Sequence, residues 1–185
     1  MPDTTALQRR TLKAEPATPE ALAPFGWMLA TRPDIAGRKL NFYSGELRAP
    51  TQFVSDDQTE ITIVRLDRRP LELVYFERHF KHTQTFVPVG DKPWLLAMAP
   101  PFEGELPPLD SIRAFRFDGR SGFCMKLGCW HEFPFALEEP TDLVVILRKE
   151  TYKDLQNVVG DEAFGADLDK KNLVRRSGIV FEIAA

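Results

Sequence analysis

The sequence predicts an all-β fold, a sandwich or barrel with only a few short helices. Short runs rich in β-branched and aromatic residues follow one another along most of the chain, and several alternate between apolar and polar positions. Turn signals separate these runs at intervals of about eight to twelve residues, which is typical of sandwiches and barrels. The 185 residues contain no internal repeat and no Gly/Ser-rich linker. We therefore expect a single domain over residues 1–185.

The composition is that of an ordinary globular protein. Hydrophobic residues make up 43% of the chain and charged residues 28%, and the net charge is −3, whereas a nucleic-acid-binding domain usually carries a basic excess. No apolar run approaches the roughly 20 residues needed to span a bilayer, and the N-terminus lacks a signal-peptide pattern. Two cysteines, Cys124 and Cys129, are too few for a disulfide scaffold and suit free thiols. We expect a cytoplasmic protein with no nucleic-acid or membrane partner.

The first fifty residues give few signals for strands. Residues 1–11 are polar, and we expect them to be flexible, with an edge strand at 10–13. Residues 27–50 follow no regular pattern, and the stretch 41–46 is the part of them that we expect to be ordered.

One short helix is predicted between these two stretches. Thr18 is a suitable N-cap, Pro19 suits the first helical position, and Glu20 lies near the positive end of the helix dipole. We expect this helix to end near Gly26, because glycine readily takes the left-handed conformation that ends a helix.

From residue 60 onward the chain predicts mainly strands. The run 94–99 is apolar throughout, which suggests a strand that is covered on both faces. Gly90-Asp91-Lys92 and Asp118-Gly119 are turn signals of the hairpin type. The predicted strands cover residues 60–66, 71–77, 83–89, 94–99, 113–117, 122–126, 143–147 and 178–183.

The segment 150–176 interrupts this series. Residues 151–159 suit a short helix, whereas 160–176 are rich in charged residues and show no strand pattern. We interpret the segment as an irregular or helical excursion from the β fold.

All three histidines of the chain fall in two short polar segments. His79 and His82 lie within 77–88, and His131 lies within 128–134. Histidine titrates nearest to neutral pH, so a site shared by the two segments would suit acid–base chemistry or metal binding. The alternative is that each histidine is an ordinary core or surface residue.

Alternation along a strand determines which side chains share a face. Glu77 and His79 point to one side and Arg78 to the other, whereas His82 and Gln84 share a face after a turn. A barrel interior that receives one of these sets forms a ligand pocket. There, a carboxylate beside an imidazole fixes its tautomer, and an arginine binds a substrate carboxylate through paired hydrogen bonds. The same residues would equally suit a structural ion pair at a sheet edge.

Three residues near His131 are further candidates. Glu132 follows it directly, Trp130 precedes it, and Lys126 lies in the preceding strand. Trp130 suits either a pocket wall or the core, and Lys126 suits either a cation at the pocket mouth or a solvated strand residue. The chain has no Ser/His/Asp arrangement and no Gly-rich phosphate loop.

A metal site is an open alternative. His79, His82 and His131 supply enough nitrogen atoms for a divalent ion, but His79 and His82 need a bulge between them to face the same side. The usual metalloenzyme barrel has His-x-His followed by a glutamate, and Gln84 stands at the glutamate position here. We therefore predict no cofactor and leave a divalent metal open.

Several motifs together resemble the ureidoglycolate lyase family, also called ureidoglycolate hydrolase. They recur in the family's order and spacing across roughly residues 12 to 150, and the resemblance implies a cupin-type β-barrel. The chain departs from the family pattern at Met125, at Glu132-Phe133, and in having His82. The matching motifs are Leu22-Ala23-Pro24-Phe25-Gly26, Glu77-Arg78-His79, Thr83-Gln84-Thr85-Phe86-Val87-Pro88, Arg113-Ala114-Phe115 and Gly128-Cys129-Trp130-His131.

The resemblance implies cleavage of ureidoglycolate to glyoxylate and urea, a step of purine degradation through allantoin. On this hypothesis His131 and His79 form the acid–base pair, oriented by Glu77 or Glu132, and Arg78 holds the substrate carboxylate. The other expected substrate-binding residues are Gln84, Lys126 and Trp130. Two alternatives stay open: a related cupin enzyme, metal-dependent or not, for another small carboxylate or carbonyl compound, and a non-catalytic cupin that binds a small molecule. The edge strands of such a barrel favour a homodimer.

Overall fold

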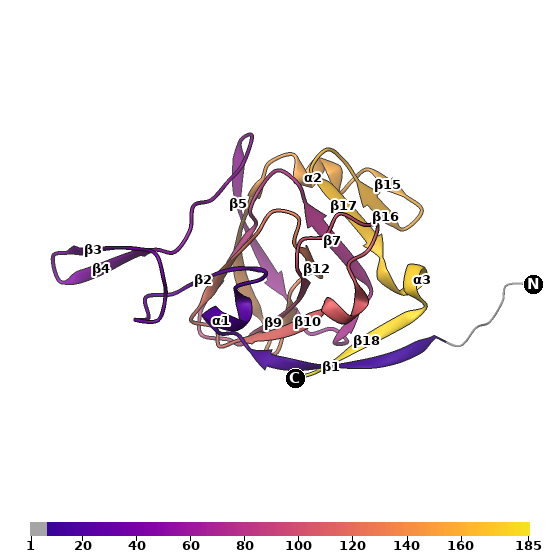
Figure 1. Ribbon diagram of the computed structural model, residues 1–185, viewed down its shortest axis with the longest axis horizontal. Coiled ribbons are helices and arrows are strands. Elements are labelled where there is room, and N and C mark those ends of the chain that lie inside the picture. The colour runs from indigo at the N-terminus through magenta and orange to yellow at the C-terminus, as the bar shows by residue number, and fades with distance from the viewer. Residues whose placement is uncertain (1–6) are drawn as a thin grey trace, which may run out of the picture.

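The computed structural model describes residues 7–185, and it confirms the all-β prediction. Two sheets curl around a common interior, and a separate hairpin projects from the body (Figure 1). Helices are short and lie at the margins. They are α1 (Pro19–Leu22), α2 (Thr151–Asp154), α3 (Leu173–Ser177) and the 3-10 turn η1 (Leu109–Ser111).

The larger sheet contains eleven strands. These are β1 (Gln8–Pro16), β6 (Glu72–Leu73), β7 (Tyr75–His79), β9 (Trp94–Ala99), β10 (Arg113–Phe117), β12 (Trp130–His131), β13 (Phe135–Ala136), β15 (Val158–Val159), β16 (Glu162–Phe164), β17 (Leu168–Asn172) and β18 (Ile179–Ala184). Their spatial order is β15-β16-β17-β7-β12-β9-β10-β1-β18-β6, with β13 pairing with β9.

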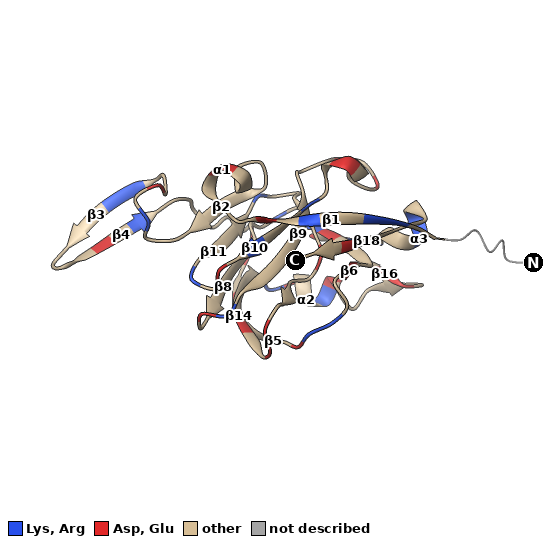
Figure 2. Cartoon of the chain, turned by 90° about the horizontal axis from the view of Figure 1, so that it is seen from below, with Lys and Arg blue, Asp and Glu red and all other residues tan. Residues whose placement is uncertain are grey.

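The smaller sheet contains five antiparallel strands. These are β2 (Gly26–Leu29), β5 (Thr59–Leu66), β8 (Thr85–Val89), β11 (Gly122–Met125) and β14 (Thr141–Arg148). Their order is β2-β11-β8-β14-β5, so β5 is an edge strand. The hairpin of β3 (Arg38–Phe42) and β4 (Gly45–Ala49) stands apart from both sheets, as Figures 1 and 2 show.

Strand β9 lies near the middle of the larger sheet, and all six of its residues are buried. Trp94, Leu96 and Met98 pack into the core between the two sheets, whereas the residues that alternate with them pack into a second core on the outer face. Because both faces are covered, the run is apolar throughout, and the prediction for 94–99 is confirmed.

The two turns predicted as hairpins instead carry the chain from one sheet to the other. The turn at Gly90 joins β8 to β9, and the turn at Gly119 joins β10 to β11. Both glycines have a positive φ, 104° and 84° respectively. A Cβ atom at Gly119 would lie 2.5 Å from the carbonyl carbon of Asp91, so the two crossings pack against each other. The turn signals were right, but the strand pairing that they suggested was wrong.

The structure corrects the expectations for the N-terminal region. Residues 1–6 of the expected flexible stretch lie outside the described residues, and from Gln8 onward the chain is strand β1. This strand is not at an edge, because it pairs in parallel with β10 on one side and β18 on the other. The helix begins as predicted, with Thr18 Oγ1 accepting from the Ala21 N–H, but it ends at Leu22. In the stretch expected to be irregular, 41–46 forms the turn of the β3–β4 hairpin.

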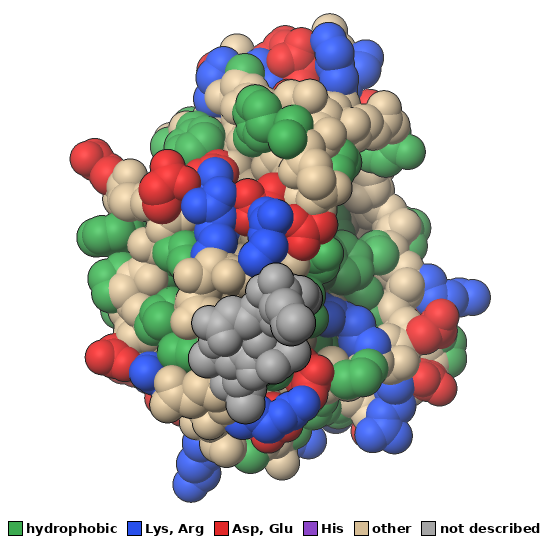
Figure 3. Space-filling model, turned by 90° about the vertical axis from the view of Figure 1, so that its right-hand side faces the viewer, with side chains coloured by type: hydrophobic (Ala, Val, Ile, Leu, Met, Phe, Trp, Pro, Cys, Tyr) green, Lys and Arg blue, Asp and Glu red, His purple; other side chains and the backbone are tan. Residues whose placement is uncertain are grey.

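The segment 150–176 is more regular than its composition suggests. It forms α2, three strands and the start of α3, and β17 pairs with β7 along its whole length. Ion pairs add to the packing of a few buried apolar residues there, as between Glu162 and Arg176, whose Oε1 and Nε atoms lie 2.7 Å apart. Figure 3 shows acidic and basic side chains side by side on this flank of the molecule.

Two further predictions concern the cysteines and membrane-spanning segments. Cys124 and Cys129 are free and buried, as expected. Within residues 7–185, no helix has the length and apolarity to traverse a bilayer.

Candidate active site

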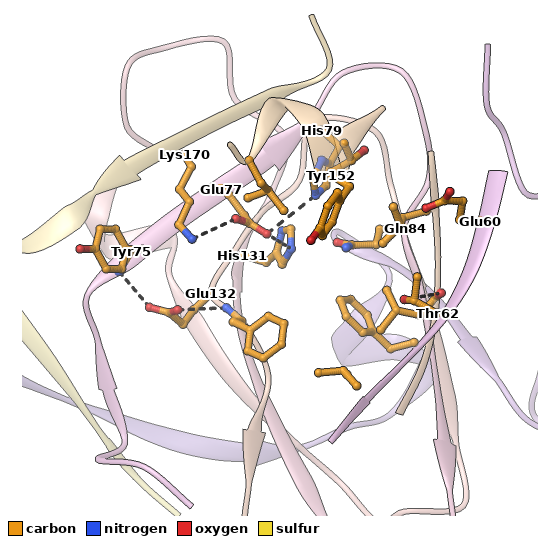
Figure 4. Close-up of a pocket in the computed structure, with 17 residues that line it drawn as sticks. Glu60, Thr62, Tyr75, Glu77, His79, Gln84, His131, Glu132, Tyr152 and Lys170 are labelled. Carbon is orange, nitrogen blue, oxygen red and sulfur yellow. Dashed lines mark hydrogen bonds and ion pairs between the residues drawn. The ribbon is translucent and has the colours of Figure 1, made fainter. Parts of the chain in front are cut away.

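A cavity of about 370 Å³ opens between the two sheets beside the main core. The smaller sheet gives it a largely apolar wall that includes Val64, Phe86 and Val145. The larger sheet gives it most of its ionisable side chains, and Tyr152 of α2 covers one end, as Figure 4 shows. A small cavity with an apolar wall and a few convergent polar groups is the usual form of a ligand site.

One row of the larger sheet brings three ionisable side chains together. Glu77 is the register partner of His131 on β12 and of Lys170 on β17, so the three side chains lie on the same face. Nε2 of His131 lies 3.4 Å from Oε1 of Glu77, and Nζ of Lys170 lies 3.8 Å from Oε2. His79 is the next inward-facing residue of β7, and its Nε2 lies 3.9 Å from Oε1 of Glu77 (Figure 4).

Burial and neighbouring charges act in opposite directions on these groups. Burial alone would raise the pKa of Glu77, but the hydrogen bond with His131 and the charges of His79 and Lys170 lower it to about 2. Burial, together with the neighbouring His82, lowers the pKa of His79 to about 3. Near neutral pH, Glu77 is therefore a carboxylate and His79 is a neutral imidazole.

A second cluster lies behind His79, away from the cavity. Nδ1 of His79 and Nδ1 of His82 lie 3.8 and 2.8 Å from the same atom, Oδ2 of Asp167. Thr151 donates a hydrogen bond of 2.7 Å to this oxygen, and the backbone N–H of Lys81 donates one of 2.8 Å to Oδ1. Although burial opposes it, the contact with His82 keeps the pKa of Asp167 well below its usual range.

Glu132 lines the cavity, but its carboxylate serves the backbone. Oε2 accepts hydrogen bonds from the N–H groups of Val74 and Tyr75 at 3.0 and 2.9 Å, and Oε1 accepts one from Phe133. Burial raises the pKa of Glu132, whereas these N–H donors and Arg69 oppose the rise. The strand predicted over 71–77 breaks at Val74 into β6 and β7, and Glu132 satisfies the N–H groups at the break.

The structure places some of the predicted site residues in the cavity and others outside it. Glu77, His79, Gln84, His131 and Glu132 line the cavity. The chain bends at Phe80-Lys81, and the ring of His82 lies 4.5 Å from that of His79, although His82 does not line the cavity.

Arg78 and Trp130 lie on the opposite face of the larger sheet, so the substrate-binding roles expected for them are not supported. Arg78 Nη2 lies 3.0 Å from Oδ2 of Asp169, and its guanidinium stacks 4.4 Å above the Trp130 ring. Both side chains also donate to the carbonyl oxygen of Phe102. Strand alternation explains the result, because Arg78 points away from its neighbours Glu77 and His79.

Lys126 also lies outside the cavity. Its ammonium group donates a hydrogen bond of 2.6 Å to the carbonyl oxygen of Ala23 and lies 5.6 Å above the Trp27 ring. It therefore ties strand β11 to the end of α1, a structural role that the sequence also allowed.

Three of the residues that the sequence did not reveal come from the segment 150–176. Lys170 and Tyr152 line the cavity, and Asp167 completes the cluster behind it. Strand β17 reads Leu-Asp-Lys-Lys-Asn and therefore shows no apolar alternation. Its polar residues pair with charges on both faces of the sheet. The sheet faces on which Asp169, Lys170 and Lys171 lie can be assigned only when β17 is placed beside β7.

Among residues 7–185, two groups of side chains have the composition of a metal site. Glu77, His79 and His131 form one, and His79, His82 and Asp167 form the other; within each, the candidate ligand atoms lie within 4.8 Å of one another. The expected set of His79, His82 and His131 is therefore divided, with His79 shared between the two groups.

Comparisons with known proteins place the chain in a family. The family model "Ureidoglycolate lyase" matches residues 9–167. Curated ureidoglycolate lyases from Pseudomonas entomophila and Pseudomonas putida are each 34% identical to the chain over 146 residues, covering 75% of this chain and 85% of theirs. The enzyme of that name from Pseudomonas fluorescens is 33% identical over 149 residues, covering 77% and 87%. A solved structure of RmlC from Streptococcus suis in complex with dTDP-D-xylose is similar with a TM-score of 0.35 and 11% identity, over 84% of each chain.

The chain belongs to the ureidoglycolate lyase family, and the resemblance drawn from its motifs is confirmed. Membership of this family makes it a lyase. The match extends to residue 167 and so ends before Lys170, the cation of the cavity.

Proposed function

We propose that this protein cleaves ureidoglycolate to glyoxylate and urea, a step in purine degradation through allantoin. The observation that carries the proposal is the row of Lys170, Glu77 and His131 in a cavity of about 370 Å³, with His79 beside it. Ureidoglycolate has a hydroxyl group and a urea nitrogen on one carbon, next to a carboxylate. Its cleavage requires proton transfer and charge stabilisation at these three groups.

In the proposed reaction, His131 moves the proton. Its imidazole accepts the hydroxyl proton as the O–H electron pair forms the C=O bond of glyoxylate. The C–N bond breaks, its electron pair goes to nitrogen, and the same proton passes from His131 to that nitrogen to give urea. The Glu77 carboxylate, 3.4 Å from Nε2 of His131, attracts the imidazolium formed between the two transfers.

The low pKa of His79, about 3, argues against the paired role expected for it, because it holds no imidazolium proton near neutral pH. We assign it instead the role of a neutral N–H donor to a substrate oxygen. Lys170 replaces Arg78 as the proposed partner of the substrate carboxylate, because Lys170 lines the cavity and Arg78 does not. Gln84 is a further polar group of the wall and is assigned to the ureido amide.

The test is incubation of the purified protein with ureidoglycolate, followed by separate assays of glyoxylate, urea and ammonia. We expect glyoxylate and urea in equal amounts without ammonia, because the proposed step breaks only the C–N bond. Ammonia in place of urea would contradict the mechanism. Absence of all products would contradict the function and favour a related cupin enzyme for another small carboxylate or carbonyl compound, or a small-molecule-binding protein.

A further inference from the structure

Behind the cavity, three potential metal ligands converge in a region that solvent does not reach. Asp167 and His82 are fully buried, and His79 is only 3% exposed. His79 is the last residue of β7, His82 follows it after a bend, and Asp167 directly precedes β17. We propose that His79, His82 and Asp167 bind a divalent first-row transition metal ion, with zinc as the best match.

Unsatisfied polar atoms in the cluster favour a bound ion. All four ring nitrogens of His79 and His82 are buried, and among the described residues none has a hydrogen-bond partner with good geometry, although Nδ1 of His82 lies 2.8 Å from Oδ2 of Asp167. Buried polar groups in folded proteins nearly always have a partner, and unpaired ones are costly. A bound ion would satisfy one nitrogen of each ring at once.

The charge of Asp167 also favours a cation. Within residues 7–185, no lysine or arginine side chain lies within ion-pairing distance of the Asp167 carboxylate, and its ionic contacts are with His79 and His82. A fully buried carboxylate requires compensation by a positive charge. A divalent ion supplies that charge and leaves both imidazoles neutral, the form in which they bind metals.

The spacing and the types of the candidate ligand atoms suit zinc. Imidazole nitrogens and a carboxylate oxygen bind zinc at about 2.0–2.2 Å, which separates neighbouring ligand atoms by roughly 3–3.5 Å. The observed separations from Oδ2 of Asp167, 2.8 Å to His82 and 3.8 Å to His79, lie on either side of that range. Thr151 and the Lys81 N–H hold the carboxylate in place, as supporting residues do around bound metals.

The outer group of Glu77, His79 and His131 is less suitable for a cation. Lys170 already places a positive charge 3.8 Å from Oε2 of Glu77, and a divalent ion there would be repelled by it. The inner group has no such competing charge. With Nδ1 of His79 bound to the metal, the ring proton is fixed on Nε2, which faces Glu77 and the cavity.

The inference concerns metal binding by itself and does not depend on the lyase reaction. The full chain is freed of metal with a chelator, dialysed against zinc or cobalt chloride, and analysed for metal per chain. We expect a single ion in the wild type, near-complete loss in Asp167→Asn and His82→Gln, and retention in His131→Gln. The last variant is the matched control, because His131 belongs only to the outer group.

If Asp167→Asn or His82→Gln fails to fold, an NMR measurement on the wild type tests the proposal instead. The chain has only three histidines, so their ring nitrogens give a simple long-range ¹⁵N–¹H spectrum, assigned with His131→Gln. Zinc should shift one nitrogen each of His79 and His82 and leave His131 unchanged. A shift at His131, loss of metal in His131→Gln with retention in Asp167→Asn, or no bound metal in the wild type would each overturn the proposal.

Discussion

Lys170 lies directly opposite Glu77 in the ladder between β17 and β7, with its ammonium group 3.8 Å from the carboxylate. His131 occupies the matching position on the other side of Glu77, in β12. A single row of the sheet therefore holds a cation, an anion and an imidazole on the face that lines the cavity. Backbone pairing fixes the spacing of the three side chains more tightly than loops would.

Replacing the cation of this row should weaken substrate binding. In Lys170→Met we expect KM for ureidoglycolate to rise about 10- to 100-fold, because a hydrogen bond to a charged group contributes roughly 1.5–3 kcal/mol. Steady-state kinetics measure the change. Lys171→Met is the matched control, since Lys171 pairs with Asp169 on the other face and should leave KM unchanged. Equal effects in the two variants would argue against a role for Lys170 in binding.

Replacing the proton-transfer group should lower turnover without unfolding the protein. We expect kcat of His131→Gln to fall by about 10²- to 10⁴-fold, the usual range for loss of general acid–base catalysis. Glu77→Gln should lower kcat as well, because the imidazolium of His131 would lose its neighbouring carboxylate. Thermal melting of both variants checks that the fold persists. A His131→Gln enzyme with wild-type kcat would remove the proposed mechanism.

Replacing Arg78 should affect stability rather than substrate binding. Its guanidinium forms a largely buried pair with Asp169 on the outer face of the sheet. Breaking such a pair costs about 3 kcal/mol, at the lower end of the usual range because Lys171 still neutralises Asp169. We expect Arg78→Met to show this loss in urea denaturation while KM stays near the wild-type value. A large rise in KM with unchanged stability would restore Arg78 as a substrate-binding residue.

The ion pair between Glu162 and Arg176 should make part of the stability depend on pH. The hydrogen bond from Arg176 holds the pKa of Glu162 at about 2, although burial opposes it. Because this lies below the ordinary value of 4.5, the stabilisation is complete above about pH 4.5 and is lost as the pH falls towards 2. The Tm difference between wild type and Glu162→Gln should therefore shrink across that interval.

Glu105→Gln is the control for the pH experiment. Glu105 also contacts Arg176, at 3.2 Å, but it is strongly exposed, and exposed pairs contribute little. A Tm difference for Glu162→Gln that stayed constant from pH 7 to pH 3 would contradict the assignment.

We propose that the protein forms a homodimer in which the edge strand β5 of each copy pairs with the other and its exposed apolar side chains become covered. Ile61 and Ile63 are 74% and 71% exposed there, β5 is an edge strand, and its neighbour β14 places Val144 and Ile146 opposite them. An edge with exposed apolar residues is prone to pairing, and a second copy can pair with it symmetrically. Sedimentation should show a dimer that Ile61→Lys/Ile63→Lys converts to monomer. A monomeric wild type would contradict this proposal.

The sequence predicted the parts of the fold and site in which apolar periodicity and residue type carry the information. Strand β9 was evident because both of its faces are packed, and alternation along β7 correctly placed Glu77 and His79 on one face. Alternation also implied that Arg78 points the other way, although a substrate role had been expected for it. The remaining parts of the fold and site depend on pairing between strands that are distant in the sequence. Lys170 and Asp167 lie in a segment held by ion pairs and hydrogen bonds, which leave no apolar pattern to read.

The position of β1 between β10 and β18 has a consequence for biosynthesis. Strand β1 leaves the ribosome well before the cavity-lining β17 and before β18, because both follow it far along the chain. Until then, one edge of β1 has no partner, and the row of Glu77 and His131 lacks Lys170. At about 5–20 residues per second, this interval is long compared with local strand formation. The nascent chain would therefore carry an unprotected strand edge while the residues between β1 and β18 are synthesised, the stage at which chaperone binding would matter most.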